Sequence, residues 1–581
     1  MQTYPTWPNL AAMMLALARA WPNKKMLRYF RDGAWHSVTW GEFGRMTASC
    51  ARHLRTAGVS AGDRVVICAE NRPEYPIVET ALMAIRAVPV PAYTTNTVDD
   101  HAHILRDSGA RAAIVSSTVL ADRFRAAGEQ SEGLDLLVTM DGTDWTTKDG
   151  PDGATMDGAI RDGTDWATMV GDTAPCDDIA LEASGIAPTA LACLIYTSGT
   201  GGAPKGVMLP HRSILSNCAG AFELVRPLGL KDETYLSYLP LSHSYEHTVG
   251  QFFLLSIGTE IVYARGVEHL AADMLTARPT VLAAVPRVLE VIRTRVLAQM
   301  ERQKPWKQAL FRQALAIGLK RLDHQPLSLV ERLIDPLLDR LVRAKVGARF
   351  GGRVVAAMSG GARLEPEVGR FFLALGLNVL QGYGQTEAGP VISANPPDGI
   401  RIETVGTVLK GVDLKIAEDG EILVRGDLVM DGYWGRPADT EATIRDGWLH
   451  TGDIGELDRD GYLRITDRKK DMIVLSGGEN VSPARVEGIL MAEPEIAQAV
   501  VSGDGRAGLT ALLVPAEGHD EISVAVAVSR ANHRLSVTER VRKHAVVGAF
   551  TVENGLLTPT QKIRRMLVIR ANHEVLAQLH G

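Results

Sequence analysis

The stretch that decides the fold is DRVVICAE, residues 63–70, together with the segments that follow it. A helical pattern follows in PEYPIVETALMAI (73–85), then a second short apolar run in VPVPAY (88–93) and a third in ARAAIVSS (110–117). Short runs rich in Val and Ile indicate strands, and strands that alternate with helices are typical of a parallel sheet with helical crossovers. We therefore predict an α/β fold with a mostly parallel sheet.

The size and composition of the chain limit the classes of protein it can belong to. It has 581 residues, 46% of them hydrophobic, which is enough for a large core and too long for one compact domain. The net charge of -6 argues against nucleic-acid binding. Its five cysteines are scattered, without the spacing of a zinc site or a disulfide framework, so we expect a reducing, cytoplasmic setting. We expect neither a signal peptide nor a transmembrane helix, and no pattern specifies an oligomeric state.

Two internal regions differ in composition from the rest. Residues 141–177 are rich in Gly, Asp and Thr and repeat the pentapeptide DGTDW, which favours an exposed loop over a functional segment. Residues 290–350 are predicted to form several helices broken by Pro305, Pro326 and Pro336. This second region contains 13 Lys and Arg against 6 Asp and Glu. Its basic surface is either an ordinary solvated helix face or a peripheral contact with an anionic membrane.

The most informative motif is YTSGTGGAPKGV, residues 196–207, between an apolar run and a helical segment that begins near Arg212. Its clustered hydroxyls and glycines predict a loop whose side chains and backbone N–H groups bind phosphate oxygens. It is not a Walker A loop, because Pro204 and Gly206 occupy positions where that motif needs Gly and Ser or Thr. A purely structural Gly/Ser turn is the alternative interpretation.

This loop resembles the TSGTTGxPKG signature of the adenylate-forming superfamily, and the resemblance extends over nearly the whole chain. It implies phosphate contacts from Thr197, Ser198, Gly199, Thr200, Gly202 and Lys205. Thr200 would also contact the metal ion. The chain departs from the signature at Gly201, where the superfamily has a second Thr, and Arg86 stands where a small residue is expected before AVPVP.

Two further motifs would bind the nucleotide. MSGGA, residues 358–362, resembles the superfamily's adenine-binding segment and implies contacts from Gly360 and Gly361. QGYGQTEAG, residues 381–389, matches its YGxTE motif. The resemblance implies that Tyr383 and Gly384 lie at the adenine, that Thr386 contacts the α-phosphate, and that Glu387 helps to hold Mg²⁺. An ATP phosphate chain needs such an ion, and one carboxylate with phosphate oxygens suits Mg²⁺.

The last motifs lie toward the C-terminus. In WLHTGDIGELDRDGYLRITDRKKD, residues 448–471, the resemblance implies that Asp453 accepts the ribose hydroxyls, that Arg468 contacts the nucleotide, and that Lys470 is the hinge. SGGEN, residues 476–480, would line the CoA tunnel through Gly477 and Gly478. NGLLTPTQKIRR, residues 554–565, places Lys562 at the position of the catalytic lysine, where an ammonium would offset the repulsion between a carboxylate and the α-phosphate.

The resemblance also implies the domain organisation. Residues 1–466 would form a large domain with doubly wound parallel sheets and a small β-barrel subdomain, and residues 467–581 a mobile α+β domain. The charged stretch 467–471 would link the two.

The reaction implied is ATP-dependent, AMP-forming ligation of a carboxylic acid to coenzyme A through an acyl adenylate, with Mg²⁺. LPLSHSYEH, residues 239–247, places His243 near the acyl carboxylate, unless it is simply a hydrogen-bonded core residue. The helical region and the segment around Lys562 resemble the long-chain fatty acyl-CoA synthetases. The alternatives are a fatty acyl-AMP ligase that serves a carrier protein, a synthetase for another hydrophobic acid, an amino-acid adenylation domain, and an inactive adenylate-binding relative.

Overall fold

The computed structural model describes residues 3–141, 166–171, 174–197, 203–477, 479–558 and 563–580. Residues 142–165, which hold most of both DGTDW copies, lie outside these ranges. The chain divides into two compact units. Unit 1 contains the residues up to Thr197, Lys205–Asp413 and Val424–Leu449, and unit 2 contains Leu414–Leu423 and the residues from His450 onward.

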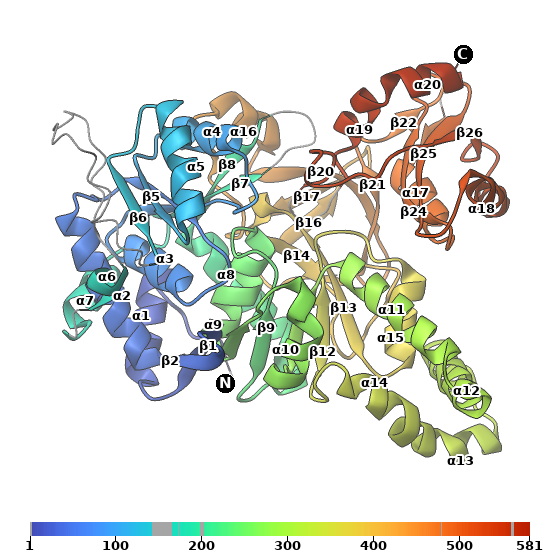
Figure 1. Ribbon diagram of the computed structural model, residues 1–581, viewed down its shortest axis with the longest axis horizontal. Helices are drawn as coiled ribbons and strands as arrows, with labels where there is room; N and C mark the ends of the chain where they lie inside the picture. Colours follow the sequence, from blue (N-terminus) through green and yellow to red (C-terminus); the bar gives the residue numbers. More distant parts are fainter. Residues whose placement is uncertain are drawn as a thin grey trace. The chain divides into compact units, whose positions relative to one another are not determined.

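The segment that begins at residue 63 forms a four-stranded parallel sheet in the order β4-β3-β5-β6 (Figure 1). Its strands are β3 (Arg64–Cys68), β4 (Val88–Pro91), β5 (Ala112–Val115) and β6 (Leu136–Thr139). The predicted helix in 73–85 is α3 (Glu74–Ala84), and α4 (Val98–Ser108) and α5 (Thr118–Glu129) follow the next strands. Strands and helices alternate as predicted, and the four residues of β5 are all buried.

The larger sheet of unit 1 has nine strands in the order β15-β14-β13-β12-β11-β9-β10-β1-β2. Its six inner strands from β13 to β1 run parallel, and antiparallel strands flank them. The strands are β1 (Lys25–Arg31), β2 (Ala34–Thr39), β9 (Thr234–Ser237), β10 (Glu260–Tyr263), β11 (Val281–Ala284), β12 (Ala356–Ser359), β13 (Asn378–Gly384), β14 (Val391–Ala394) and β15 (Thr407–Val408). The two parallel sheets confirm the predicted α/β class.

The predicted helical region packs against the nine-stranded sheet. It consists of α11 (Pro286–Glu301), α12 (Pro305–Leu322), α13 (Leu329–Leu338), the π-helix η5 (Asp339–Arg343) and α14 (Ala344–Ala348). One buried cluster joins side chains from these helices to side chains from the strands. Pro305 begins a helix and Pro326 lies between two helices, as predicted. The break predicted at Pro336 is wrong, because α13 continues through it and changes to a π-helix three residues later.

Two smaller sheets carry further predicted motifs. A three-stranded sheet, in the order β18-β8-β7, contains β7 (Leu191–Thr197), β8 (Lys205–Pro210) and β18 (Gly432–Tyr433). The helix expected near Arg212 is α8 (His211–Val225). Where a small β-barrel is expected, β16 (Asp413–Ile416), β17 (Glu421–Arg425), β20 (Trp448–Leu457) and β19 (Ile444–Arg445) form a sheet, with β21 (Leu463–Arg468) beside β20.

Unit 2 is an α+β structure with its own buried core. Strands β24 (Ile496–Ser502), β25 (Leu509–Pro515) and β26 (Val541–Val546) form its sheet, and β22 (Ile473–Val474) pairs with β23 (Asn480–Val481). Its helices are α17 (Pro483–Met491), α18 (Glu521–His533), α19 (Arg565–Ala571) and α20 (His573–His580). Strand β21 extends to Arg468, so the first two residues of the expected linker 467–471 lie in a strand.

Arg86, one of the two departures noted in the sequence, lies in the left-handed region with φ 63°. A side chain with a Cβ is strained in that region by about 1 kcal/mol, whereas glycine is not. The expectation of a small residue at this turn therefore has a physical basis in the backbone conformation. Within the described ranges, no helix combines the length and apolar character that crossing a membrane requires.

Candidate active site

Three segments that carry predicted site residues follow parallel strands of the nine-stranded sheet. Strands β9, β12 and β13 run in the same direction, so the residues after each of them lie at one edge. Ligands of open α/β sheets bind at the edge where the parallel strands have their carboxyl ends. The three segments hold His243, Gly360 with Gly361, and Thr386 with Glu387.

Hydrogen bonds join these segments to one another. The hydroxyl groups of Ser244 and Thr386 lie 2.9 Å apart, and the Tyr245 hydroxyl donates to the carbonyl oxygen of Met358 at 3.1 Å. A Cβ at Gly360 would lie 3.3 Å from the Tyr245 ring, so the absence of a side chain there leaves room for the ring. The motif around His243 is thus in direct contact with the two motifs predicted to bind the nucleotide.

His243 is half-buried, and its Nδ1 accepts a hydrogen bond from the backbone N–H of Tyr245 at 3.2 Å. In a neutral imidazole, the proton then lies on Nε2, which makes that nitrogen a donor. This arrangement fits a ring that donates to a carboxylate.

The YGxTE motif turns sharply at its glycine. Tyr383 is half-buried near the end of β13, and Gly384 is exposed. The N–H of Gln385 donates to the Pro390 carbonyl at 2.9 Å, which brings the chain back against the strand. A Cβ at Gly384 would lie 1.9 Å from that carbonyl oxygen, so only glycine fits.

Glu387 is half-buried and accepts a hydrogen bond from the Tyr433 hydroxyl at 2.8 Å. Burial and the negative charge of Glu387 raise the pKa of Tyr433, so the phenol stays protonated and donates. The ammonium of Lys205 lies 4.9 Å from the Tyr433 ring centroid and 3.0 Å from Asp439. Two predicted site residues, Glu387 and Lys205, therefore contact the same tyrosine, which the sequence did not single out.

Lys205 also shows how the two strands beside the predicted phosphate loop are paired. It is the cross-strand partner of Thr197 in the β7–β8 pair, so the two described ends of the loop are neighbours. The predicted residues between them, Ser198, Gly199, Thr200 and Gly202, lie outside the described residues, as does the departure at Gly201.

Helix α8 supports the turn that carries Thr386 and Glu387 through one side chain, that of Asn217. The side chain of Asn217 donates to the Ala388 carbonyl at 3.0 Å and accepts from the Val391 N–H at 2.8 Å. Asn217 is buried, so losing it would leave backbone groups without partners. No sequence motif indicated this residue, because its contacts depend on tertiary packing.

Glu246 is a buried carboxyl beside the site that the sequence also did not single out. It accepts hydrogen bonds from Ser237 Oγ at 2.6 Å and from the Tyr235 hydroxyl at 2.7 Å. Complete burial raises its pKa to about 7, and the two hydroxyl donors only partly offset that rise. Gly250 lies directly against it, since a Cβ there would be 2.5 Å from the carboxyl carbon of Glu246. Both residues belong to the π-helix η3 (Glu246–Phe253), a geometry that often marks functional sites.

In unit 2, Asp453 and Arg468 are cross-strand partners on β20 and β21. Arg468 Nε donates to Asp453 Oδ1 at 2.9 Å, and Asp453 is 4% exposed whereas Arg468 is exposed. The structure thus brings together two residues that the motif predicted separately. A carboxylate held by a guanidinium on one oxygen retains further lone pairs for neutral donors such as ribose hydroxyls.

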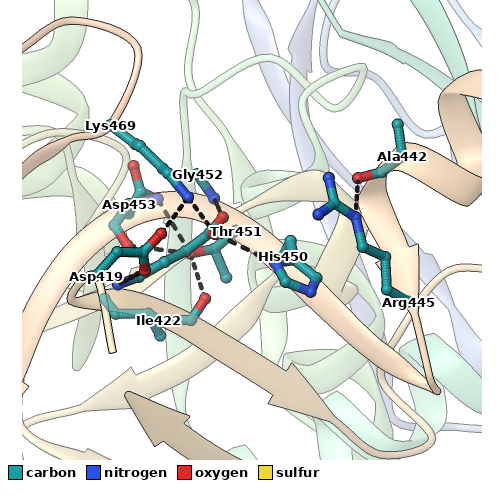
Figure 2. A network of polar contacts seen from close by, with 10 residues as sticks. Asp419, Ile422, Ala442, Arg445, His450, Thr451, Gly452, Asp453 and Lys469 are labelled. Atoms are coloured by element: carbon teal, nitrogen blue, oxygen red, sulfur yellow. Dashed lines mark hydrogen bonds and ion pairs between the residues drawn. The ribbon is translucent and has the colours of Figure 1, made fainter. Parts of the chain in front are cut away.

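A second network of ion pairs lies beside strand β20 (Figure 2). Lys469 Nζ lies 2.6 Å from Asp419 and 3.0 Å from Glu421, and His450 lies 3.1 Å from Glu421. Burial alone would raise the pKa of Glu421, but hydrogen bonds from Lys469, His450 and the Gly452 N–H lower it. The sequence pointed to Arg468 and Lys470, whereas Lys469 between them makes these contacts and fixes the turn after β21.

The remaining predicted residues of unit 2 lie at loops. Lys470 and Gly477 are exposed, and Gly478 lies outside the described residues. Lys562 also lies outside them, but the residues that flank its segment are defined. Leu557 and Ile563 form an antiparallel bridge, so the two ends of the segment that carries Lys562 are neighbours. Three residues beyond Lys562, the Arg565 guanidinium binds the buried Glu487 with two contacts of 2.6 Å.

Comparison with known sequence families identifies both parts of the chain. Residues 16–434 match the AMP-binding enzyme family, and residues 470–579 match the AMP-binding enzyme C-terminal domain. The long-chain-fatty-acid–CoA ligase FadD15 of Mycobacterium bovis is 32% identical, over 96% of this chain and 95% of its own. The long-chain-fatty-acid–CoA ligase 5 of Mus musculus is 29% identical, over 87% of this chain and 78% of its own.

Solved structures share the fold. The anthranilate CoA ligase AuaEII in complex with anthranoyl-AMP superposes with a TM-score of 0.74 at 20% identity, over 99% of each chain. The o-succinylbenzoate CoA synthetase of Bacillus subtilis in complex with ATP and magnesium ion gives 0.70 at 22% identity, over 96% of this chain and 98% of that one. With a family match that covers most of its length and a relative 32% identical over 96% of it, the chain belongs to the AMP-binding enzyme family.

Proposed function

We propose that this protein ligates a long-chain fatty acid to coenzyme A in two steps, with ATP converted to AMP and pyrophosphate. The observation that carries the proposal is the 32% identity to a long-chain-fatty-acid–CoA ligase, which extends over 96% of the chain. The motif residues that the chemistry needs are all present in the sequence, from the phosphate loop to Lys562.

In the first step, a carboxylate oxygen attacks the α-phosphorus of ATP, and the bond to the pyrophosphate oxygen breaks. Thr386 faces the α-phosphate. Since a hydroxyl has one proton and two lone pairs, Thr386 can accept from Ser244, 2.9 Å away, and donate to a phosphate oxygen. Lys205 and Thr197, with Ser198, Gly199, Thr200 and Gly202, bind the departing pyrophosphate. His243 donates through Nε2 to the acyl carboxylate, and Tyr383, Gly360, Gly361 and Gly384 surround the adenine.

The residues around Glu387 suit a magnesium ion. Glu387 has one oxygen bonded to the neutral hydroxyl of Tyr433, and no cation of the described chain forms an ion pair with it. Mg²⁺ prefers one or two carboxylates together with phosphate oxygens and water, so Glu387, with Thr200, would hold it. When bound, the ion neutralises negative charge on the phosphate oxygens.

The second step joins the acyl group to coenzyme A. The thiol sulfur attacks the acyl carbon, the bond from that carbon to the AMP oxygen breaks, and the thiol proton leaves to solvent. Lys562 serves the first step by offsetting negative charge at the α-phosphate, Asp453 accepts the ribose hydroxyls, and Arg468 contacts the nucleotide. Residues 467–581 form a domain that moves at Lys470 between the two steps and brings Gly477 and Gly478 to the CoA.

We also propose a cytoplasmic protein that contacts membranes peripherally through the basic helical segment 290–350. Long-chain acids partition into bilayers, so such a contact would bring the enzyme to its substrate.

The test is formation of AMP and acyl-CoA by the purified protein, with Mg·ATP, CoA and fatty acids of graded length. The Lys562→Ala variant is the control. We expect thioester formation to be highest with long chains and to fall by about 100-fold or more in the variant.

Each other outcome has a definite meaning. Adenylate without thioester would favour the carrier-dependent ligase. If thioester formation were highest with a short or aromatic acid, the proposed reaction would stand but the substrate class would be different. No turnover of any acid would overturn the proposal.

A further inference from the structure

The outermost helix of the 290–350 region exposes a continuous row of leucines. Leu329, Leu333, Leu337 and Leu341 follow one another at intervals of four residues on α13 and η5, and they are 79%, 80%, 52% and 39% exposed. Val330 beside the first of them is also exposed. Residues four apart lie on one side of a helix, so these side chains form one apolar face, which we call the leucine face.

The leucine face is not needed for packing within unit 1. The adjoining side of the same helices carries Leu338, Val342 and Val346, which are buried in the cluster that packs on the nine-stranded sheet. Figure 1 shows α13 at the edge of unit 1, beyond α12 and away from the strands. One apolar side of the helix is therefore buried against the rest of unit 1, and a second apolar side is exposed to solvent. Contiguous exposed apolar surface of this kind marks an interaction site.

The charges around the leucine face that have no ion-pair partner in the described residues are all positive. Its three acidic residues are already paired within the fold, Glu331 with Lys320 at 2.6 Å and Asp335 and Asp339 both with Arg343. The exposed basic residues Arg332, Arg340, Lys345 and Arg349 have no acidic partner within the described ranges. An apolar face accompanied by unpaired cations is complementary to a surface that is apolar inside and anionic outside.

We propose that the leucine face, with Arg332 and Arg340, binds the surface of an anionic lipid bilayer, with α13 lying parallel to it. The leucines enter the boundary between headgroups and acyl chains, and the guanidinium groups contact lipid phosphates. A second copy of this chain fits less well, because a two-fold contact between leucine faces would bring the same unpaired cations together. The choice of lipid over an acidic protein rests in part on the proposed function, since long-chain acids reside in bilayers.

The test is sedimentation of the full-length protein with vesicles, either pure phosphatidylcholine or phosphatidylcholine mixed with phosphatidylglycerol. Leu333→Ser/Leu337→Ser removes apolar surface, and Arg332→Gln/Arg340→Gln removes charge. Ile522→Ser/Val526→Ser is the matched control, because these residues of α18 are also four apart and are 76% and 52% exposed. All variants change exposed residues, and their thermal midpoints verify that they are folded.

We expect tighter binding to the anionic vesicles and weaker binding as salt rises. The leucine variant should bind them at least about tenfold more weakly, since two partly buried leucine side chains are lost. The arginine variant should lose about fivefold for each charge removed. The control variant should bind like the unchanged protein.

Four results would overturn the proposal. The first is equal binding to both kinds of vesicle. The second is a leucine variant that binds like the control. The third is a dimer, measured by light scattering, that becomes a monomer in the leucine variant and binds no vesicles. Absence of vesicle binding by a monomeric protein would leave the leucine face to a protein partner, and would also overturn it.

The proposed function is tested separately, with a short, soluble fatty acid and no vesicles. AMP formation under those conditions should be the same in all four proteins. Vesicle binding without AMP formation would refute the function and keep the leucine face. AMP formation without vesicle binding would support the proposed function and refute membrane binding by the leucine face.

Discussion

Glu387 in unit 1 and Asp453 in unit 2 are both carboxylates that the motifs assign to the nucleotide, but the two have different partners. Glu387 is half-buried and accepts from the neutral hydroxyl of Tyr433. Asp453 is almost completely buried, and Arg468 donates to it from the paired strand. A carboxylate with a neutral donor keeps its net charge, whereas one with a guanidinium has that charge largely balanced.

This difference separates two kinds of recognition. The uncompensated charge of Glu387 suits a cation, and the compensated charge of Asp453 suits hydroxyl groups, which need acceptor atoms more than they need charge. The same residue type can thus serve the metal ion in one place and the ribose in another. The partner side chain, and not the carboxylate itself, sets the chemistry.

The largest effect is expected from Glu387→Gln, which keeps the shape of the side chain and removes its charge. Adenylate formation, measured by acid-dependent exchange of pyrophosphate into ATP, should fall on the order of 100-fold, because the charge that we propose holds the metal ion is lost. More Mg²⁺ should be needed for half-maximal activity. Activity within about threefold of the unchanged enzyme would show that the charge of Glu387 does not serve a cation.

Glu246→Gln tests how a fully buried carboxyl with only neutral hydrogen-bond partners affects the free energy of unfolding as pH changes. The folded protein raises the pKa of Glu246 from 4.5 to about 7, so the folded state holds a proton that the unfolded chain releases. Its contribution to the free energy of unfolding is fully present below about pH 4.5 and is lost as pH rises through about 7, by up to about 3 kcal/mol. Thermal midpoints of both proteins, measured from about pH 5 to about pH 8, should shift in favour of the variant as pH rises. A constant difference between the two would contradict this view.

Asp453→Asn should act on the nucleotide and less on the chemical step. Loss of a charged hydrogen-bond acceptor should raise the KM for ATP about 10- to 30-fold. The unchanged enzyme should discriminate against 2′-deoxy-ATP or 3′-deoxy-ATP, and the variant should lose that discrimination. If the variant weakened ATP and the deoxy analogues equally, Asp453 would act only by holding Arg468.

The smallest effect is expected from Tyr433→Phe, which removes one neutral donor to Glu387 and keeps the ring beside Lys205. Activity should fall about three- to tenfold, in line with one hydrogen bond. A loss as large as that of Glu387→Gln would mean that Tyr433 contacts the substrate itself. It would also mean that the charge of Glu387 does not explain the difference between its site and that of Asp453.

The α/β class was predictable because strands buried on both faces leave a local signal. The four residues of β5 are all buried, and a run such as AAIV shows this directly in the sequence. The continuity of α13 through Pro336 was not predictable in the same way, because packing on the sheet holds the helix together through the proline.

The site was predictable where its residues are contiguous in a motif, as Thr386 and Glu387 are. Tyr433 was not singled out, and Ser244 and Glu246 had no role assigned within the motif 239–247, because the fold brings the partner of each residue close to it. Tyr433, for example, is 46 residues from Glu387 and lies in the three-stranded sheet, whereas Glu387 follows β13 of the nine-stranded sheet. Lys469 was missed for another reason, since two neighbouring basic residues matched the family pattern and it did not. The assigned roles of the site residues and the domain boundary at 466/467 stay predictions.

The contact between Gly250 and Glu246 restricts how this family can vary. A Cβ at 250 would lie 2.5 Å from the carboxyl carbon of Glu246, so no side chain fits there while that carboxyl keeps its hydrogen bonds to Tyr235 and Ser237. A relative with Ala or Ser at 250 should therefore have a shorter residue at 246, and one that regains the glutamate should first regain the glycine. The two positions should therefore change together across an alignment of relatives.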